Sequence, residues 1–340
     1  MIDLSVIVPV YNMAGDGKLN YSLDSLVNQT MRNMEIIAVD DKSTDNSLDI
    51  LKDYEKRYPG RVRVIASPEN RRQGGAKNLG LKEAGGRFIG FMDSDDWMKE
   101  DAYEKMFNLA VETGADAVGV DMSLVSEHTM TPGVKAECNN SGQTGILDHE
   151  TRERFLLKPG PLVTKIYARE VFFDRPFAFP EHISYEDNAT MTDIVMRIKH
   201  FEFIAEADYF YYQHGSSTTH SITKKKCEER MEAMRIMYNH SKENGSLTEY
   251  KEAIEYQFAN MFYRNTLFTY MQGNMKKEIS FVENLGREMT DLFPDFRNNP
   301  YYIKEVNKYE RDLIDLQLKN TGWFFFIYKL KQISKKLKGK

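Results

Sequence analysis

Three carboxylates, Asp93, Asp95 and Asp96, follow the apolar run at residues 88–92 of this 340-residue chain. The run is preceded by two glycines and is typical of a short buried strand. Side chains alternate between the two faces of a strand, so Asp93 and Asp95 are predicted to project together. Two such carboxylates repel each other unless a cation lies between them. Their oxygens suit Mg²⁺ or Mn²⁺, which often bind one or two carboxylates together with substrate phosphates.

The acidic run also fits a solvated turn that caps the next helix, and the surrounding elements help to choose between the two interpretations. Apolar strands alternate with helical patterns: strands at residues 4–10, 34–39, 62–65, 88–92 and 117–121, and helices at residues 19–27, 48–55, 76–84 and 101–113. This alternation predicts an α/β fold, with a Rossmann-like, mostly parallel sheet and helices on both faces. Such sheets bind ligands beyond the carboxyl ends of their strands.

Polar clusters fall at three of these strand ends. Pro9, Tyr11 and Asn12 lie at the end of the first strand, and Asp40 and Asp41 at the end of the second. The acidic run lies at the end of the fourth strand. Asp40 and Asp41 could instead belong to a turn that caps the next helix, and the polar residues after them would suit such a turn. The convergence of three clusters nevertheless predicts one ligand site at this edge of the sheet.

The rest of the chain predicts a second half of this domain and then a helical region. The patterns indicate a polar excursion with little core at residues 126–148, a helix at 188–199, two short strands at 201–205 and 208–212, and long helices at 224–244, 250–271 and within 276–293. We therefore expect a catalytic domain over residues 1–220, with one half at 1–120 and the other at 121–220. An α-helical extension with a basic, amphipathic tail is expected over residues 221–340.

Composition excludes some classes of protein. Hydrophobic residues make up 41% and charged residues 29%, as in an ordinary globular protein. The net charge of −5 does not indicate nucleic-acid binding. Cys138 and Cys227 lie far apart without metal-ligand spacing, which favours a reducing compartment. The beginning of the chain lacks a signal-like pattern and no run is long enough to span a bilayer, so we expect a cytoplasmic protein.

The end of the chain combines an aromatic run with lysines. Residues 323–340 contain Trp323, three consecutive phenylalanines and six lysines, ending at Lys340, and no acidic residue. A helix of this kind can lie in the interface of an anionic membrane, which predicts a peripheral contact on the inner leaflet. It can equally pack on the domain and leave a solvated basic end.

Several stretches, taken in order, resemble the family-2 glycosyltransferases, inverting enzymes with the glycosyltransferase-A fold. The stretches are residues 5–12 (SVIVPVYN), 25–30 (SLVNQT), 35–45 (EIIAVDDKSTD), Asn70, 74–80 (GGAKNLG) and 91–96 (FMDSDD). Residues 185–187 (YED) and 211–214 (YYQH) resemble acceptor-side motifs, so the resemblance covers residues 1–220. Lys77 stands where an arginine is commoner. The Gln-x-x-Arg-Trp signature and the membrane spans of processive synthases are absent, which indicates a non-processive bacterial type.

The resemblance implies a nucleotide-sugar donor, most often UDP-linked, and a divalent cation, Mn²⁺ or Mg²⁺. It implies that Asp95 holds the metal, assisted by Asp93 or Asp96. Asp93 and Ser94 are expected near the donor, with Asp93 close to the ribose or the metal. His214 is expected near the diphosphate or the metal, or in a structural hydrogen bond.

The nucleotide base is expected at the ends of the first two strands. Asp40 or Asp41 would accept the uracil imide N–H, a hydrogen bond that a charged acceptor strengthens. Pro9, Tyr11 and Asn12 would form the wall beside the base.

The reaction needs further charged groups, and the resemblance suggests candidates. Lys77 or the pair Arg71-Arg72 could contact the diphosphate. Inverting transfer needs one general base that deprotonates the acceptor hydroxyl. Asp187 is the expected base, with Glu186 supporting or replacing it. The same pair could simply cap the helix that follows, where carboxylates are favoured.

We therefore expect a metal-dependent inverting glycosyltransferase that acts on a lipid-linked or polysaccharide acceptor in cell-surface glycan synthesis. The alternative is a catalytically idle protein that binds nucleotide sugars or serves as a membrane-associated scaffold. A sugar nucleotidyltransferase is less well supported, because it would need a glycine-rich, basic loop directly after the first strand. The residues do not identify the sugar, the acceptor or the linkage.

Overall fold

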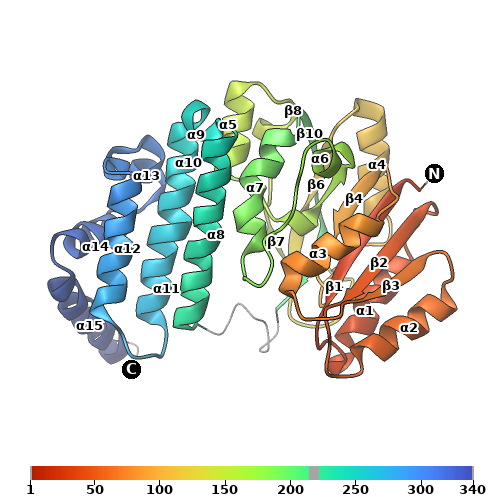
Figure 1. Cartoon of the computed structure of the whole chain (residues 1–340), viewed down its shortest axis with the longest axis horizontal. Coiled ribbons are helices and arrows are strands. Elements are labelled where there is room, and N and C mark those ends of the chain that lie inside the picture. Colours follow the sequence, from red (N-terminus) through yellow and green to blue (C-terminus); the bar gives the residue numbers. More distant parts are fainter. Residues whose placement is uncertain (1, 214–221, 339–340) are drawn as a thin grey trace. The chain divides into compact units, whose positions relative to one another are not determined.

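Figure 1 shows the computed structural model of the chain, which describes residues 2–213 and 222–338, with side chains described as far as residue 330. The chain divides into two compact units, Met1–His220 and Ser221–Lys340. The first unit contains a mixed sheet with helices packed on it. The described part of the second unit contains helices only.

The first unit is built on a ten-stranded sheet. Its main order is β3-β2-β1-β4-β9-β6-β10-β5, with β7 beside β6 and β8 beside β10. The strands are β1 (Leu4–Val10), β2 (Met34–Asp40), β3 (Val62–Ala66), β4 (Phe88–Phe91), β5 (Trp97–Met98), β6 (Ala117–Val125), β7 (Val134–Ala136), β8 (Gly145–Ile146), β9 (Lys165–Ala168) and β10 (His200–Tyr212).

Parallel pairing joins the strands that matter for the site. β1 pairs in parallel with β2 and β4, and β2 pairs in parallel with β3. β9 lies between β4 and β6 and is antiparallel to both, while β6 and β10 are parallel. Every residue of β1 and β2 is buried, as expected for strands covered on both faces. The predicted α/β fold with a mostly parallel sheet is confirmed, and β1, β2, β4 and β6 all end at the same edge.

Seven α-helices accompany the sheet in the described part of the first unit. They are α1 (Lys18–Val27), α2 (Ser47–Arg57), α3 (Arg72–Glu83), α4 (Ala102–Thr113), α5 (His149–Leu157), α6 (Glu170–Phe173) and α7 (Glu186–Arg197). In Figure 1, α3 lies across β1 and β2. Gly80 permits this close packing, because a Cβ there would lie 2.4 Å from Ile7 Cγ2. α7 begins two residues before its predicted start, which places Glu186 and Asp187 in its first turn.

Two predictions for this unit were wrong in detail. The two short strands expected at 201–205 and 208–212 are one strand, β10, whose register with β6 shifts between Ile204 and Tyr209. Such a bulge continues the pairing while it bends the strand. The polar excursion at 126–148 contributes β7 and β8 to the sheet and buries Cys138, Asn139 and Gln143. Composition did not indicate this core, because two of its buried residues, Asn139 and Gln143, are polar amides whose hydrogen bonds are made within the protein.

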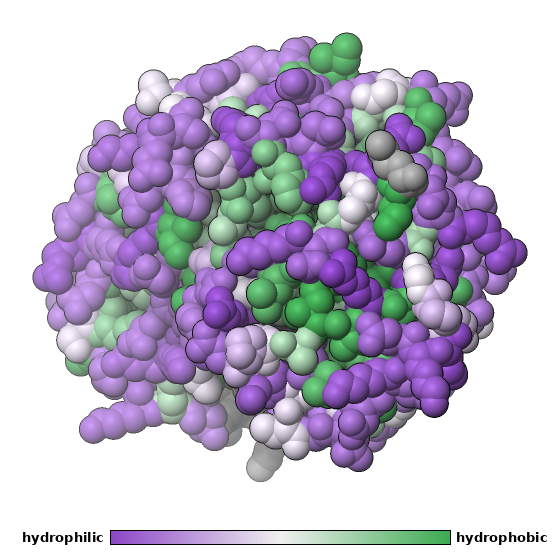
Figure 2. Space-filling view, turned by 45° about the vertical axis from the view of Figure 1, so that its right-hand side comes forward, coloured by the Kyte–Doolittle hydropathy of each residue, from purple (hydrophilic) through white to green (hydrophobic). Residues whose placement is uncertain are grey.

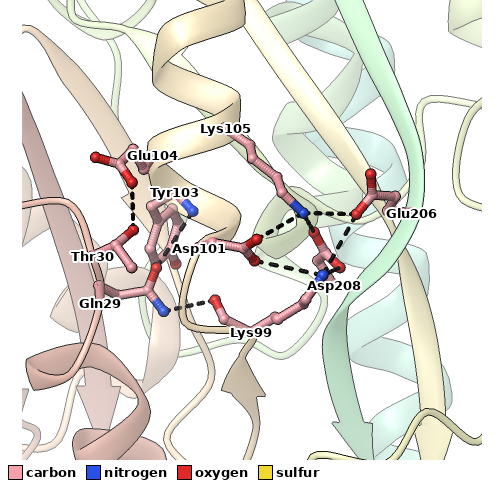
Figure 3. Close-up of polar contacts among 9 residues, drawn as sticks. All are labelled: Gln29, Thr30, Lys99, Asp101, Tyr103, Glu104, Lys105, Glu206 and Asp208. Carbon is pink, nitrogen blue, oxygen red and sulfur yellow. Dashed lines mark hydrogen bonds and ion pairs between the residues drawn. The ribbon is translucent and has the colours of Figure 1, made fainter.

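A cluster of charged residues holds the bulge of β10 against α4 (Figure 3). Lys105 Nζ lies 2.8 Å from Glu206 and 3.0 Å from Asp101, and the buried Asp208 is 3.6 Å from the same nitrogen. On the other side of the view, the Gln29 side chain donates to the backbone carbonyl of Lys99 at 2.8 Å. The motif at residues 25–30 thus holds the end of α1 against the segment that follows the acidic run.

The second unit is helical throughout its described part, as the sequence predicts. Its helices are α8 (Lys224–Glu243), α9 (Ser246–Glu249), α10 (Lys251–Phe258), a π-helical segment (Ala259–Asn265), α11 (Thr266–Gln272), α12 (Ile279–Leu292), α13 (Pro300–Glu305), α14 (Lys308–Lys319) and α15 (Thr321–Lys338). The predicted helix at 250–271 corresponds to α10 and α11 joined through the π-helical segment. Met231, Met234 and Met237 are buried in the core of this unit.

The face of the molecule shown in Figure 2 is largely polar. Hydrophilic residues cover most of the face in Figure 2, and hydrophobic residues gather in a hollow near its middle. Among the described residues, no helix combines the length and the apolar character that crossing a membrane requires.

Candidate active site

The acidic residues predicted from the sequence come together at one edge of the first unit's sheet. In the register of the parallel strands, Val10 of β1 lies beside Asp40 of β2, and Ile7 of β1 beside Phe91 of β4. The segments after β1, β2 and β4 therefore leave the sheet side by side. The clusters that begin at Tyr11, Asp41 and Asp93 share this edge, as predicted.

The loops after β1 and β2 are tied to each other by Asn12. Its backbone N–H donates to Ser43 Oγ at 3.0 Å, and its side-chain oxygen accepts the N–H of Thr44 at 2.8 Å. Asn12 itself has a φ of +53°, a left-handed conformation that asparagine tolerates better than most residues. This side chain therefore joins the two loops, and the neighbouring Tyr11 is exposed beside it.

Asp40 and Asp41, which the sequence left as alternatives, differ in their partners. Both are 2% exposed. Asp40 Oδ2 accepts the N–H of Ser43 at 3.2 Å, while its Oδ1 is buried and has no hydrogen-bond partner among the described residues. Asp41 Oδ1 accepts the N–H of Arg71 at 2.8 Å. Burial raises the pKa of Asp41, although the backbone N–H groups of Arg71 and Arg72 oppose this shift.

The acidic run after β4 is anchored through its last member. Tyr209 donates its hydroxyl to Asp96 Oδ2 at 2.7 Å, and the N–H of Tyr212 donates to Asp96 Oδ1 at 2.8 Å. The N–H of Asp93 reaches the same Tyr209 hydroxyl at 3.4 Å. β10 thus fixes the turn that carries Asp93 and Asp95. Burial raises the pKa of Asp96 well above its usual range, and both of its oxygens are already engaged.

A buried ion pair joins α3 to α7 at the same edge. Lys77 is 2% exposed, and its Nζ donates to Glu186 Oε1 at 2.5 Å and to Gln73 Oε1 at 3.2 Å. Burial lowers the pKa of Lys77, but the carboxylates of Glu186, Asp93 and Asp187 raise it by more. The lysine therefore remains charged among three carboxylates.

Two carboxyl groups near this lysine, those of Asp93 and Asp187, have raised pKa values. Burial and the nearby Asp95, Glu186 and Asp187 raise the pKa of Asp93 to about 7, although Lys77 lowers it. Burial and then Glu186 raise the pKa of Asp187. One buried cation is thus insufficient for the negative charge gathered here, and a further cation would relieve it.

The glycine-rich motif of α3 positions the segment that leads into α7. Gly74 allows the Pro180 carbonyl to approach, because a Cβ at this residue would lie 2.0 Å from that oxygen. The Asn78 side chain donates to the Phe179 carbonyl at 2.9 Å and accepts the Phe179 N–H at 2.8 Å. Asn78 lies in the motif at residues 74–80, and no role for it was predicted from the sequence. Its place four residues after Gly74, on the same helix face, was the available signal.

The pair Arg71-Arg72 lies at the start of α3 and makes contacts within the protein. Arg71 forms ion pairs with Glu69 at 2.8 Å and Glu181 at 3.3 Å, and Arg72 donates to Ser184 Oγ at 3.2 Å. These contacts link the helix start to the segment before α7. Lys77, by contrast, faces the acidic residues.

The carboxylates fit a metal that is shared with a bound donor better than one enclosed by protein. Among the described residues, no group of three or more His, Cys, Asp or Glu side chains could hold a metal by itself. Mg²⁺ and Mn²⁺ are often held by one or two carboxylates plus substrate phosphates, which Asp93 and Asp95 can provide. Asp96 is engaged by β10, and the predicted ligand His214 lies outside the described residues. Ser94 is buried between the two candidate ligands.

Comparison with known proteins agrees with this geometry. Residues 5–150 match the family described as "Glycosyl transferase family 2". The "Uncharacterized glycosyltransferase EpsJ" of Bacillus subtilis is 30% identical over 247 residues, which are 70% of this chain and 70% of that protein. The "Poly(ribitol-phosphate) beta-glucosyltransferase" of Bacillus spizizenii is 31% identical over 61% of this chain, and the match spans about a third (32%) of that protein's length.

Solved structures share the fold. The TarS protein of S. aureus, residues 1–349 in complex with UDP-GlcNAc, has a TM-score of 0.58 at 21% identity, over 91% of this chain and 78% of that one. The mannosyltransferase PcManGT of Pyrobaculum calidifontis, in complex with GDP-Man and Mn²⁺, has a TM-score of 0.51 at 16% identity, over 98% of this chain and 87% of that one. With the EpsJ match, the site motifs and the fold, these findings confirm the family expected from the sequence: this chain belongs to glycosyltransferase family 2.

Proposed function

We propose that this chain is a metal-dependent, inverting glycosyltransferase. It would move a sugar from a nucleotide-sugar donor, UDP-linked by preference, to a hydroxyl of a lipid-linked or polysaccharide acceptor in cell-surface glycan synthesis. The observation that carries the proposal is that two separate acidic segments meet around one buried lysine. Asp93 and Asp187 belong to separate segments, the turn after β4 and the start of α7, and both interact electrostatically with Lys77.

The acidic turn after β4 and the start of α7 differ in the role that their surroundings favour. Asp93 and Asp95 would hold Mn²⁺ or Mg²⁺ together with the donor diphosphate, and the metal would supply Lewis-acid stabilisation of the leaving group. Asp96 keeps this turn in place through Tyr209. The donor base would lie between Tyr11 and the ends of β1 and β2.

Asp187 is the better candidate for the general base. Glu186 is held by Lys77, so its charge is already balanced by a direct ion pair. Asp187 has a raised pKa caused by burial and by Glu186, which brings it closer to the range that suits a base at neutral pH. Glu186 would then act as a positioning residue that keeps Lys77 and the start of α7 together.

The comparisons support the choice of donor and acceptor. TarS was solved with UDP-GlcNAc, and PcManGT with GDP-Man and Mn²⁺. One relative is named as a glucosyltransferase of poly(ribitol-phosphate). For this chain we therefore expect a UDP-sugar and an acceptor from surface polysaccharide or teichoic acid synthesis.

The test is release of UDP from a panel of UDP-sugars by the full chain with Mn²⁺. Asp187→Asn is expected to lower the transfer rate by roughly a hundredfold to ten-thousandfold. Asp95→Asn is expected to abolish both transfer and the heat of Mn²⁺ binding in calorimetry. Asp174→Asn, at an exposed residue outside the site, is the matched control and should leave transfer unchanged. Full transfer by both site variants would show that the roles are wrongly assigned.

Calorimetry with UDP separates the enzyme from the idle alternative. An enzyme of this kind should bind UDP more tightly with Mn²⁺ than without it. A protein that binds UDP in a metal-coupled way but transfers no sugar from any donor would be a nucleotide-sugar-binding protein instead. The anomeric configuration of the product, measured by NMR, tests inversion: a product that keeps the donor's configuration contradicts the inverting mechanism.

A further inference from the structure

The last helix, α15, buries one of its faces within the second unit. Phe324 is fully buried and Tyr328 is 8% exposed. Their rings lie 5.7 Å apart, and Tyr328 also stacks on Phe268 of α11 at 6.5 Å. The sequence left two interpretations of this helix, and packing on the domain describes this face.

The opposite face of α15 exposes a second row of apolar side chains. Trp323, Phe326 and Leu330 are 57%, 54% and 47% exposed. Spacings of three and four residues place them on one side of a helix, and the first two rings meet edge to face at 5.5 Å. The same spacing continues in the sequence to Ile333 and Leu337. We call the three described side chains the apolar ridge.

The charges along this part of the chain are all of one sign. After Asp315 the sequence contains no Asp or Glu. Lys329 is exposed beside the ridge, and five more lysines follow it: Lys331, Lys335, Lys336, Lys338 and Lys340. An exposed apolar ridge is therefore continued by a strongly positive chain end.

We propose that the apolar ridge of α15 docks on the surface of an anionic lipid bilayer. An amphipathic helix lies in the membrane interface with its apolar side chains inserted, and lysines strengthen the binding by contacting acidic headgroups. Tryptophan is enriched at this depth because its ring is apolar and its N–H is polar. The second face explains how one helix can both pack on the protein and contact lipid.

A second copy of the chain is the main competing occupant, and the charges argue against it. Two copies that paired through this ridge would bring lysine-rich segments together, because residues 316–340 contain no Asp or Glu in either copy. Like charges in close contact oppose association. An anionic surface has the opposite sign. The inference does not depend on the proposed sugar transfer, because it concerns only the second unit.

The test is flotation of the full-length protein with vesicles. The protein is expected to bind vesicles of phosphatidylcholine that contain about one third phosphatidylglycerol, the anionic lipid. Binding should be weak to vesicles of phosphatidylcholine alone and should fall as salt is added. Failure to bind the anionic vesicles at low salt would overturn the proposal.

Two sets of variants test the two parts of the surface. The triple variant Trp323→Ser, Phe326→Ser and Leu330→Ser should weaken vesicle binding by about a hundredfold or more, since three apolar anchors are lost. Neutralising Lys335, Lys336 and Lys338 with glutamine should weaken it by about a hundredfold, at roughly fivefold for each lysine. Because these ridge side chains are exposed, the thermal unfolding temperature should stay nearly unchanged.

The matched control removes exposed apolar side chains elsewhere in the same unit. Ile303→Ser and Tyr309→Ser change residues that are 46% and 48% exposed. This double variant should bind vesicles like the wild type. Equal loss in the control and the ridge variant would show that the ridge has no special role. A wild-type dimer in analytical ultracentrifugation that the ridge variant abolishes, without vesicle binding, would assign the face to a second copy and overturn the proposal.

Discussion

Two lysines in the first unit are buried to the same depth, and their surroundings are opposite. Lys77 on α3 is 2% exposed and Lys165 on β9 is 1% exposed. Lys77 is paired with Glu186 and interacts with two further carboxylates. Lys165 donates to the Pro161 carbonyl at 3.0 Å and to Thr164 Oγ1 at 3.4 Å, both neutral acceptors.

Their pKa values move in opposite directions for this reason. Burial lowers the pKa of both amino groups, but only Lys77 has nearby carboxylates that raise it above the ordinary value. For Lys165, burial dominates and lowers the pKa to about 7, although Cys138 and Asp121 oppose this shift. A buried lysine therefore keeps its charge where carboxylates surround it, and loses its proton more readily where its hydrogen-bond acceptors are neutral.

The strongest test of this difference is Lys77→Met. The substitution leaves Glu186, Asp93 and Asp187 buried without a cation, so we expect a loss of about 3–5 kcal/mol in the free energy of unfolding. Urea unfolding at neutral pH measures it. The loss should shrink as the pH is lowered, because buried carboxyl groups that have lost their cation take up protons. Lys77 lowers the pKa of Asp93, so in the variant that pKa lies above the wild-type value of about 7, and the Asp93 share of the loss should fall as the pH is lowered towards 7.

The control for this experiment keeps the charge. Lys77→Arg places a cation at the same residue, although its planar fork differs from an ammonium group. It should recover most of the lost stability. A Lys77→Met protein as stable as the wild type at neutral pH would show that the carboxylates of the site are neutralised in another way.

A smaller effect is expected at Asp96, a carboxylate held by neutral donors. Tyr209→Phe removes the hydroxyl that bonds both Asp96 and the N–H of Asp93. We expect Mn²⁺ affinity, measured by calorimetry with UDP, to fall by roughly 10- to 100-fold, the usual cost of losing a group that orients metal ligands.

Tyr103 provides the matched control for this substitution. It is fully buried in α4, and its hydroxyl has no hydrogen-bond partner among the described residues. Tyr103→Phe should therefore leave Mn²⁺ affinity unchanged and should not lower stability. If both variants weaken Mn²⁺ binding equally, Tyr209 does not orient the acidic turn.

Much of this arrangement could be predicted from the sequence, because the signals were local. Apolar runs marked β1, β2 and β4, and the carboxylates directly after them lie at strand ends wherever the sheet is parallel. The rule for parallel sheets then brought Asp40, Asp41 and Asp93 to one edge without any knowledge of distant contacts.

The partners across the site could not be predicted, because they are distant in sequence. Lys77 and Glu186 are separated by 109 residues and Asp96 and Tyr209 by 113. The sequence offered Asp96 as a candidate to assist Asp95 at the metal, and only its hydrogen bonds to Tyr209 and Tyr212 show that it is an anchor. The hydrogen bonds of Asn12 to Ser43 and Thr44 were hidden for the same reason.

The smallest and most discriminating effect is expected for Lys165→Met. Replacing a buried amino group by an apolar side chain of similar size loses two hydrogen bonds to neutral groups but removes the cost of burying a charge. We expect stability at about pH 7 to be unchanged or raised by up to roughly 2 kcal/mol. In the wild type, the unfolded lysine keeps its proton up to its ordinary pKa, while the folded one releases it near pH 7. Wild-type stability should therefore rise between about pH 7 and pH 10, and the variant should lack this rise. Urea unfolding across this range measures both slopes. A loss of stability as large as that of Lys77→Met would mean that Lys165, too, is held as a paired cation.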